Sequence, residues 1–278
     1  MSAPCTQQSG KGGSISFLKS VNIDTSKAES QQYCVGDTDT SKKFEDYIEG
    51  TPVMAALYGI NVAAKKVWGK KPDLVVSGPN EGNNLGFLNN NSGTLGAAMI
   101  SIAQGIPAIA VSAADGDAKK AEKVSEVVVN VIAELEKNKA KDAPLLPQFT
   151  GLNINTPKDM DNHKGIKFTN VGWNAGGYSP SFTDDLSQNK MMVGYMAQNM
   201  AAKTGMEFEK AQAQILKMLT GKAGISFDMS KDYPDQSESS EGVAVHQGYI
   251  TISTIDGNVQ ANQTKVDYVN NKLSALNK

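Results

Sequence analysis

Hydrophobic residues recur at helical spacing directly behind Thr51 and Pro52, a capping hydroxyl followed by a residue that is tolerated at the first helical position. This pattern predicts a helix. A short apolar run over 74–76, a small-residue helical stretch over 95–103 and a second apolar run over 106–111 follow it. Strand, helix and strand in that order predict two parallel strands joined by a crossover helix.

The alternation of strands and helices continues along the chain. Apolar residues between 124 and 135 form one stripe, with lysine and glutamate opposite, and predict an amphipathic helix over one face of the sheet. A further strand is expected over 152–155. From 172 to 241 the sequence changes to a Gly/Ser/Asn-rich loop, two helical patterns over about 190–202 and 207–219, and a polar run. We interpret this part as an appendage to the core.

The chain closes with two expected strands, 243–245 and 249–254, and a terminal helix whose apolar stripe runs from Val266 to Leu276. The complete order predicts a three-layer, Rossmann-like α/β fold with a mostly parallel sheet and a C-terminal appendage of helices and a β-hairpin. The expected parts are an α/β core over 1–171, a helical and loop insertion over 172–241, and the closing strands and helix over 242–278.

Composition excludes several partners. With 27 basic and 29 acidic residues and a net charge of −2, the chain has no global field that favours nucleic-acid backbones or anionic membranes. It contains no arginine, so bidentate guanidinium clamps on phosphate cannot form. Its longest apolar runs are too short to span a bilayer. Cys5 and Cys34 fit either two free cytosolic thiols or one extracytoplasmic disulfide.

A loop rich in glycine and asparagine, 77–86, directly follows the first predicted sheet strand, and Thr94 stands in the first turn of the next helix. In open α/β sheets, ligands bind at the carboxyl ends of strands, where a helix N-terminus offers unpaired N–H groups to phosphate. Asn80 can offer an amide oxygen to Mg²⁺ or Mn²⁺, and Ser92 and Thr94 can donate hydroxyls to phosphate. The same residue types also dominate ordinary turns and caps.

The glycine spacing in this loop weakens two other nucleotide-binding interpretations. Gly78, Gly82 and Gly86 are four apart, which differs from the GxGxxG pattern of dinucleotide-binding proteins. The GxxxxGK[ST] phosphate loop of nucleoside triphosphatases is also absent from the sequence.

The motifs resemble a known family, the SurE-type 5'/3'-nucleotidases. Its central signature is similar to the segments 72–86, 92–94 and 105–112. Further similar pieces occur in the family's order: Ala3-Pro4 with 9–14 near the start, 49–52 at the helix start, and 244–253 near the end. The resemblance extends from Met1 to about Pro157 and resumes at the closing strands.

This resemblance implies a metal-dependent phosphomonoesterase that hydrolyses nucleoside 5'- or 3'-monophosphates with a metal-activated water. The family holds its divalent metal, Mg or Mn, with two adjacent aspartates, a serine and an asparagine. The matching serine and asparagine here are Ser9 and Asn80. Substrate and phosphate contacts carry over to a second group: Gly10, Asn83, Asn84, Ser92, Gly93 and Thr94.

The family's aspartate pair, which lies in an Asn-Asp-Asp-Gly turn after its first strand, has no counterpart in this chain, so the catalytic residues stay unassigned. By comparison with the family, we expect a strand, a helix and most of another strand ahead of Ser9, on the order of 30 residues or more, which this sequence does not contain. A hydroxyl and an amide alone are expected to bind metal poorly. Asp115 and Asp117 offer a substitute pair, although a polar turn is the favoured interpretation. The alternative function is a non-catalytic nucleotide- or phosphate-binding protein.

Other polar residues have simpler interpretations. His163 and His246 lack a partner at a spacing that indicates a general base, although His246 would approach the site if the closing segment folds over the core. A methionine stripe over 191–206 is expected to be core or subunit contact. Lys11 is interpreted as a solvated lysine rather than a phosphate ligand, and the Asp184-Asp185 pair as helix caps.

The resemblance also implies partners and a compartment. We expect a phosphomonoester substrate, no duplex nucleic acid, no membrane, and a homodimer or tetramer in which the terminal helix docks on the partner subunit. A cytoplasmic location follows from the resemblance. A periplasmic or secreted location stays open, because a signal peptide would lie in the missing region.

Overall fold

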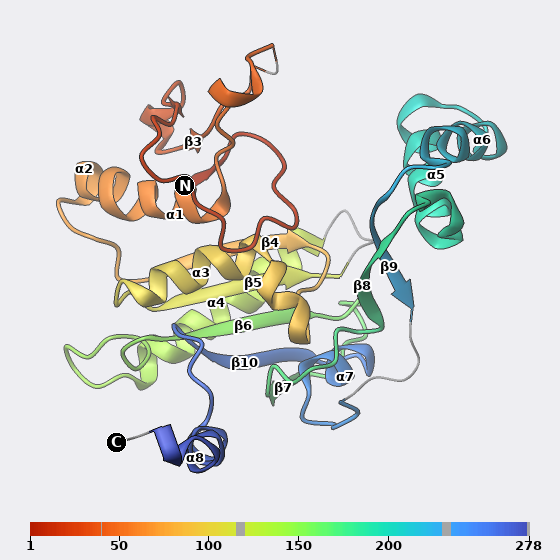
Figure 1. The fold of residues 1–278 in the computed structure, drawn as a ribbon. Helices are drawn as coiled ribbons and strands as arrows, with labels where there is room; N and C mark the ends of the chain where they lie inside the picture. The colour runs from red at the N-terminus through yellow and green to blue at the C-terminus, as the bar shows by residue number, and fades with distance from the viewer. Residues whose placement is uncertain (40, 115–119, 230–234, 277–278) are drawn as a thin grey trace.

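A five-stranded sheet forms the centre of the computed structural model, which describes residues 1–39, 41–114, 120–229 and 235–276 (Figure 1). From one edge to the other its strands are β4 (Val75–Glu81), β5 (Ala108–Ala113), β6 (Thr150–Thr156), β10 (Ile250–Asp256) and β7 (Ile166–Thr169). β4, β5 and β6 run parallel, whereas β10 pairs antiparallel with β6 and parallel with β7. The predicted α/β class with a mostly parallel sheet is confirmed.

Helices alternate with these strands through the first half of the chain. The helix predicted behind Thr51 is α1 (Pro52–Tyr58), which continues through a π-helical turn (Gly59–Ala63) into α2 (Ala64–Trp68). The later helices are α3 (Gly93–Ala103), α4 (Lys120–Asn138), α5 (Lys190–Thr204), α6 (Phe208–Leu219), α7 (Glu241–His246) and α8 (Gln263–Lys272). Short 3-10 turns lie at Ala28–Ser30, Phe44–Asp46, Gly86–Asn91, Leu186–Gln188 and Ser274–Leu276.

β4, α3 and β5 form the predicted strand–helix–strand unit. Val75 lies beside Ala108, and Asn80 lies beside Ser112, in parallel register. All six residues of β5 are buried, as expected for a strand that is covered on both faces. The prediction of adjacent parallel strands joined by a crossover helix is therefore confirmed.

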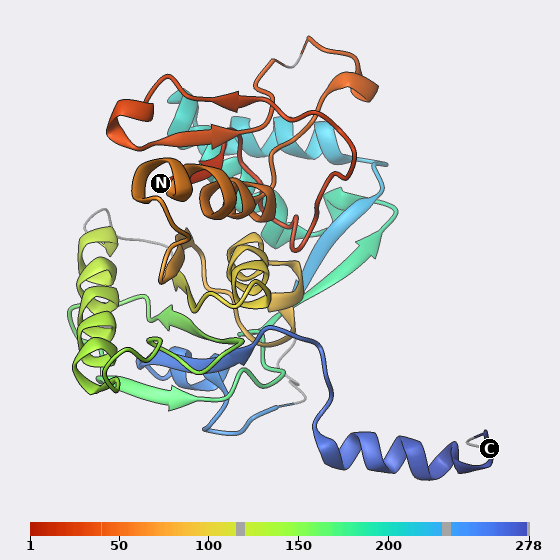
Figure 2. The ribbon, with the colours of Figure 1, turned by 90° about the vertical axis from the view of Figure 1, so that its left-hand side faces the viewer.

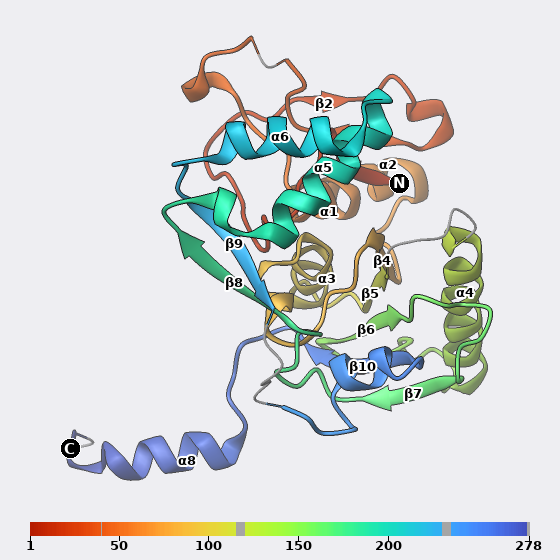
Figure 3. The same cartoon turned by 90° about the vertical axis from the view of Figure 1, so that its right-hand side faces the viewer.

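The two faces of the sheet pack against different helices (Figure 3). On one face, Ile109 and Ile154 join a core cluster with Val124 of α4. On the other face, Ala108 and Ala110 pack against α3. Because successive side chains of a strand point to opposite faces, one strand serves both layers. A helix layer on each side of the sheet is the three-layer arrangement that the sequence predicts.

The closing region corrects one prediction. The stretch 243–245 was expected to be a strand, but it lies in α7, where the N–H of Ala244 donates to the carbonyl of Ser240. Ala244 and Val245 are buried against the sheet. Three consecutive apolar residues form too short a run for periodicity to distinguish a strand from a buried helical turn. The neighbouring prediction over 249–254 corresponds to β10.

The appendage is built on two strands that the sequence did not predict, β8 (Tyr178–Thr183) and β9 (Gly224–Met229). They pair antiparallel, and α5 and α6 lie between them in sequence. This pair, rather than the closing segment, is the two-stranded element of the appendage. Met192, Met196 and Met200 pack into a cluster with Ile215 of α6, so the methionine stripe contributes to a local core.

The N-terminal strands form a separate sheet. β1 (Ser2–Pro4) pairs parallel with β3 (Tyr33–Val35), and β3 pairs antiparallel with β2 (Ile23–Asp24). Cys5 and Cys34 form a disulfide with their Cα atoms 4.9 Å apart. Of the two alternatives for the cysteines, the structure therefore has the bonded form.

A groove of about 200 Å³ separates β1 from β4, the edge strands of the two sheets. It is lined by Ser2 of β1, by Ala55 and Ile60 from the α1–α2 helix, and by Val75 and Val76 of β4. Val76 is 44% exposed. Two strand edges thus border the same partly apolar groove.

α8 extends away from the rest of the chain (Figure 2). None of its residues is buried, and Val269 of α8 and Leu273 directly behind the helix are each 50% exposed. Lys265 Nζ lies 5.9 Å from the centre of the Trp173 ring. Within the described ranges, no helix has the length and apolar character needed to cross a membrane.

Replacing both cysteines, Cys5→Ser with Cys34→Ser, should lower the free energy of unfolding by about 3 to 4 kcal/mol, because the disulfide closes a loop across 29 positions and restricts the unfolded chain. Urea unfolding followed by circular dichroism measures the change. Reductant should destabilise the original protein by a similar amount and leave the serine variant unaffected. Equal unfolding midpoints in the two oxidised proteins would contradict this expectation.

Candidate functional site

The carboxyl end of β4 leads into a loop that reaches the N-terminus of α3. Ser77 Oγ donates to the carbonyl of Thr94 at 2.9 Å and ties β4 to the first turn of α3. Asn80 Nδ2 donates to the carbonyls of Glu81 and Gly82, at 3.0 and 2.7 Å. These bonds use the amide nitrogen of Asn80 and leave its Oδ1 oxygen as an acceptor.

The N-terminus of α3 is capped and closely packed. Ser92 Oγ accepts the N–H of Leu95 at 3.2 Å, so Ser92 has the cap role that was the competing interpretation of this residue. Its hydroxyl hydrogen can still donate to a further acceptor. A Cβ atom added to Gly93 would lie 2.6 Å from the Pro52 ring, so the glycine permits α1 to approach α3.

A glycine-rich loop, 9–14, lies against the same helix end. The N–H of Gly12 donates to the carbonyl of Asn91 at 3.1 Å. Thr51, the cap of α1, donates its hydroxyl to the carbonyl of Ser14 at 2.6 Å. The N-termini of α1 and α3 and this loop therefore meet at one place, although they are far apart in the sequence.

The structure describes Ser9 and Gly10 at the exposed side of this loop. Ser9 Oγ accepts a hydrogen bond from Gln7 Nε2 at 2.6 Å. Gly10 has a φ of +78°, and a Cβ atom there would meet nothing within 4 Å. Among the hydrogen bonds of the described residues, none joins Ser9 to Asn80. Their roles as metal ligands stay predictions.

Two asparagines hold the β4–α3 loop on the sheet. Asn83 Nδ2 donates to the carbonyl of Thr156 at 3.1 Å. Asn84 donates its N–H to Asn155 Oδ1 and accepts at its carbonyl from Asn155 Nδ2, both at 2.9 Å. Its own Nδ2 donates to Ser112 Oγ at 2.6 Å. The loop is therefore attached to β5 and β6 through side chains.

A buried carboxylate extends this network. Glu241, the first residue of α7, is fully buried and accepts from the N–H of Gly86, Asn89 Nδ2, Asn153 Nδ2 and Ser253 Oγ, at 2.8 to 3.1 Å. Burial raises the pKa of Glu241 to about 7, and the four hydrogen bonds oppose that rise.

Sequence reasoning missed Glu241, Asn153 and Asn155. One signal was present, because polar and apolar residues alternate in Leu152-Asn153-Ile154-Asn155, within a strand that is buried on both faces. Buried asparagines require hydrogen-bond partners, so this alternation indicates a polar network on one face. The partners themselves come from distant segments and leave no local pattern.

Comparison with known families identifies the chain by its first two thirds. Residues 1–177 match the family model described as "Survival protein SurE". The chain belongs to the SurE family. The resemblance that the motifs predict is thus confirmed.

Several proteins of known name are similar to this SurE-family chain. A "5'-nucleotidase SurE" of Thermosipho africanus is 38% identical over 133 residues, 47% of this chain and 48% of the relative. An "Acid phosphatase" of Yarrowia lipolytica is 35% identical over 173 residues, 56% of this chain and 48% of the relative. The chain spans about half the length of these curated relatives.

A solved structure supports the same fold over more of the molecule. The crystal structure of the SurE protein from Aquifex aeolicus aligns with a TM-score of 0.61 and 25% identity. The alignment covers 94% of this chain and 84% of that chain. The three-layer arrangement is therefore that of SurE.

The donor set does not by itself fit a divalent metal. Ser9 and Asn80 would supply one hydroxyl and one amide oxygen, both neutral. In the part of the chain that the structure describes, no three His, Cys, Asp or Glu side chains gather as a metal site. Hard cations need anionic oxygen ligands to offset their dehydration. Asp115 and Asp117, the substitute pair, lie outside the described residues.

The other candidates have structural partners. Lys11 Nζ lies 2.5 Å from a carboxylate oxygen of Glu49. His163 Nδ1 accepts the N–H of Gly165 in an exposed turn. His246 bonds the carbonyl of Gly242 through Nδ1. Asp185 caps the 3-10 turn Leu186–Gln188, and hydrogen bonds from Ser187 and its neighbours lower the pKa of Asp185 to about 2.

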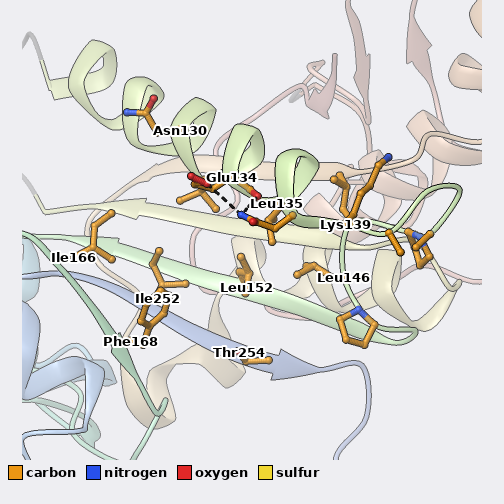
Figure 4. Close-up of a pocket in the computed structure, with 17 residues that line it drawn as sticks. Asn130, Glu134, Leu135, Lys139, Leu146, Leu152, Ile166, Phe168, Ile252 and Thr254 are labelled. Atoms are coloured by element: carbon orange, nitrogen blue, oxygen red, sulfur yellow. Dashed lines mark hydrogen bonds between the residues drawn. The ribbon is translucent and has the colours of Figure 1, made fainter.

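A large apolar groove of about 680 Å³ lies elsewhere, between α4 and the β10–β7 edge of the sheet (Figure 4). Leu135 and Leu146 line it together with Phe168 and Ile252. The strand residues that line it point to the face of the sheet that α4 covers, which is the face opposite α3. This groove is therefore separate from the carboxyl end of β4, which carries Asn80.

The titration of Glu241 should make stability depend on pH. Its pKa is about 7 in the folded protein against 4.5 ordinarily, so the folded state keeps a proton that the unfolded chain releases. Stability from this group is therefore full below about pH 4.5 and is lost as the pH rises through about 7. Relative to Glu241→Gln, the original protein should lose stability between about pH 5 and about pH 8, measured as urea unfolding midpoints. Parallel pH profiles would exclude this titration.

Proposed function

We propose that the chain is the α/β core of a phosphomonoesterase that hydrolyses nucleoside 5'- or 3'-monophosphates. The observation that carries this proposal is the meeting of β4, the 9–14 loop and the N-terminus of α3 at one end of the sheet. Relatives named 5'-nucleotidase and acid phosphatase support the reaction class. A helix N-terminus beside a parallel strand end suits a phosphate group.

The phosphate would bind mainly to backbone groups and hydroxyls. The chain has no arginine, and Lys11 already faces Glu49. The first N–H groups of α3 have no partner within the helix, and Ser92 and Thr94 stand at this end. In this proposal Gly93 and Gly10 let the backbone approach the phosphate oxygens, and Asn83 and Asn84 hold the loop.

The metal requires carboxylates, and the described residues contain no group of three His, Cys, Asp or Glu side chains that could hold it. Ser9 and Asn80 would be two of its ligands, and the family's aspartate pair would come from an added upstream segment. When bound, Mg²⁺ or Mn²⁺ would neutralise charge on the phosphoryl oxygens and activate water. We propose that such a segment enters the groove between β1 and β4, where, among the described residues, each of these strands has one edge without a paired strand.

Binding without hydrolysis is the second candidate function. It is favoured by the neutral donor set, because a site of hydroxyl, amide and N–H groups can hold phosphate without a metal. Inorganic phosphate binding in the absence of turnover would support this alternative. Turnover by the chain as it stands would exclude it.

Adding an upstream segment with Asn-Asp-Asp-Gly should produce metal-dependent phosphatase activity on nucleoside monophosphates. In that longer chain, Asn80→Ala should lower the activity at least about tenfold, because it removes a metal ligand. Release of inorganic phosphate, with and without a chelator, measures this effect. Asn90→Ala is the matched control and should change little. Equal losses in the two variants would remove Asn80 from the site.

We further propose a homodimer in which α8 docks on the partner subunit. Val269 and Leu273 leave an exposed apolar stripe on a helix too short to be stable alone in water. The polar connection from 257 to 262 lets α8 leave its own core.

Deleting residues from Lys265 onward should convert a dimer to a monomer, measured by light scattering at micromolar concentration. The N-terminal disulfide is distant in sequence, so its reduction serves as a control and should leave the dimer intact. An intact chain that is already monomeric would end this proposal, and so would a deletion that leaves the dimer unchanged.

We propose an oxidising compartment for this protein, the alternative to the cytoplasm that the sequence leaves open. The disulfide between Cys5 and Cys34 supports it, because such bonds persist mainly outside the reducing cytosol. Thiol labelling of the protein from its native source tests this location.

A further inference from the structure

Glu241 joins two parts of the molecule through its two carboxylate oxygens. Oε1 accepts from the N–H of Gly86 and from Asn89 Nδ2, both in the connection between β4 and α3. Oε2 accepts from Asn153 Nδ2 of β6 and Ser253 Oγ of β10. One oxygen therefore faces the loop and the other faces the sheet.

The surrounding contacts leave little room for a substitute. A Cβ atom on Gly86 would lie 2.6 Å from the carbonyl oxygen of Asn174, and one on Gly242 would lie 2.2 Å from the same oxygen. The loop, the start of α7 and the segment at Asn174 are pressed together. The ionised carboxylate, which predominates above the pKa of about 7, offers about four acceptor positions, and the four neighbouring donors fill them.

Burying this carboxylate costs free energy, because the charged group leaves water. The sheet side of its network is itself organised: Thr169 and Ser253 hydroxyls lie 2.8 Å apart, and Ser253 donates onward to Glu241. A merely structural core position would be filled at lower cost by an apolar side chain. A role in holding the β4–α3 connection explains why a buried carboxylate occupies this position.

We infer that Glu241 is a positioning residue, which clamps the β4–α3 connection onto the sheet and so sets the place of the phosphate-binding end of α3. The role in phosphate binding rests on the proposed function. The clamp itself does not, because it consists of contacts within the chain. Glu241 touches no substrate in this account and acts through Gly86 and Asn89.

Hydrogen exchange of the full chain, read by mass spectrometry, tests the clamp. In Glu241→Gln the amide group replaces one acceptor oxygen with a donor, which faces other donors. Exchange in peptides covering 83–91 should become at least about tenfold faster, equivalent to about one lost hydrogen bond. Peptides from α5 and α6 should be unchanged. Glu238→Gln, an exposed glutamate three positions away, is the matched control and should match the original protein.

Two milder variants cover the case in which Glu241→Gln fails to fold. Asn89→Ala removes one bond on the loop side, and Ser253→Ala removes one on the sheet side. A clamp predicts faster exchange over 83–91 in both. If exchange changes in neither, or only near α7, the inference is wrong.

Titration of inorganic phosphate by calorimetry gives the second readout. Glu241→Gln should weaken phosphate binding about tenfold, whereas Glu238→Gln should not, and Glu241→Asp should restore part of the affinity because it keeps the charge. Unchanged affinity in Glu241→Gln would overturn the link to the phosphate site. If the original protein binds no phosphate, the proposed function fails, and the exchange data alone decide whether Glu241 clamps the loop.

Discussion

The amide of Asn155 pairs with both backbone groups of Asn84, and the rest of the site depends on this exchange of two hydrogen bonds. Gly82 still donates to a carbonyl of β5, but beyond it the β4–α3 connection leaves the strand ladder. A buried backbone group without a partner costs about 1 to 3 kcal/mol. Asn155 replaces the missing strand neighbour, so the loop can lie on the sheet rather than in solvent. The starting point of α3 follows from where that loop is held.

Successive side chains of a strand alternate between the two faces of the sheet, and this explains why the polar partners of the loop lie together. Ser112, Asn155 and Thr251 are neighbours in register across three strands, and all three are buried on the α3 face. The residues before and after each of them along its own strand point the other way, into the apolar layer under α4. The α3 face thus carries a row of polar side chains that can orient a loop, beside the apolar cluster under α3, whereas the α4 face is apolar.

Local patterns predicted the part of the fold in which neighbours in sequence are neighbours in space. The helix behind Thr51, the β4–α3–β5 unit and α4 follow from caps and periodicity. The 243–245 helix was mistaken for a strand because its apolar run is short. β7, β8 and β9 were not predicted, since their pairing partners are distant in sequence and their outward faces are largely polar or exposed.

The candidate site also contains residues that could be predicted from the sequence and residues that could not. The loop residues from Asn80 to Thr94 could be selected from sequence, because glycine, asparagine and hydroxyl residues cluster directly behind a strand. Glu241 could not, because its partner Gly86 is 155 positions away. A buried carboxylate is recognised only when the donors around it are known.

The proposed insertion of an upstream strand into the groove between β1 and β4 would bring the family's aspartate pair to the candidate site. Asn80 lies at the carboxyl end of β4, and the chain leaving β1 leads to the 9–14 loop, which packs at the N-terminus of α3. A strand that entered the groove parallel to both neighbours would end between these two loops, because the carboxyl ends of parallel strands meet at one edge of a sheet. Aspartates directly behind it would then stand near Asn80 and Ser9. An antiparallel strand would place the aspartates at the opposite ends of the strands, near Trp68 and Pro72, where neither candidate ligand lies. In this proposal, the direction of the inserted strand, rather than its mere presence, would decide whether a metal site forms.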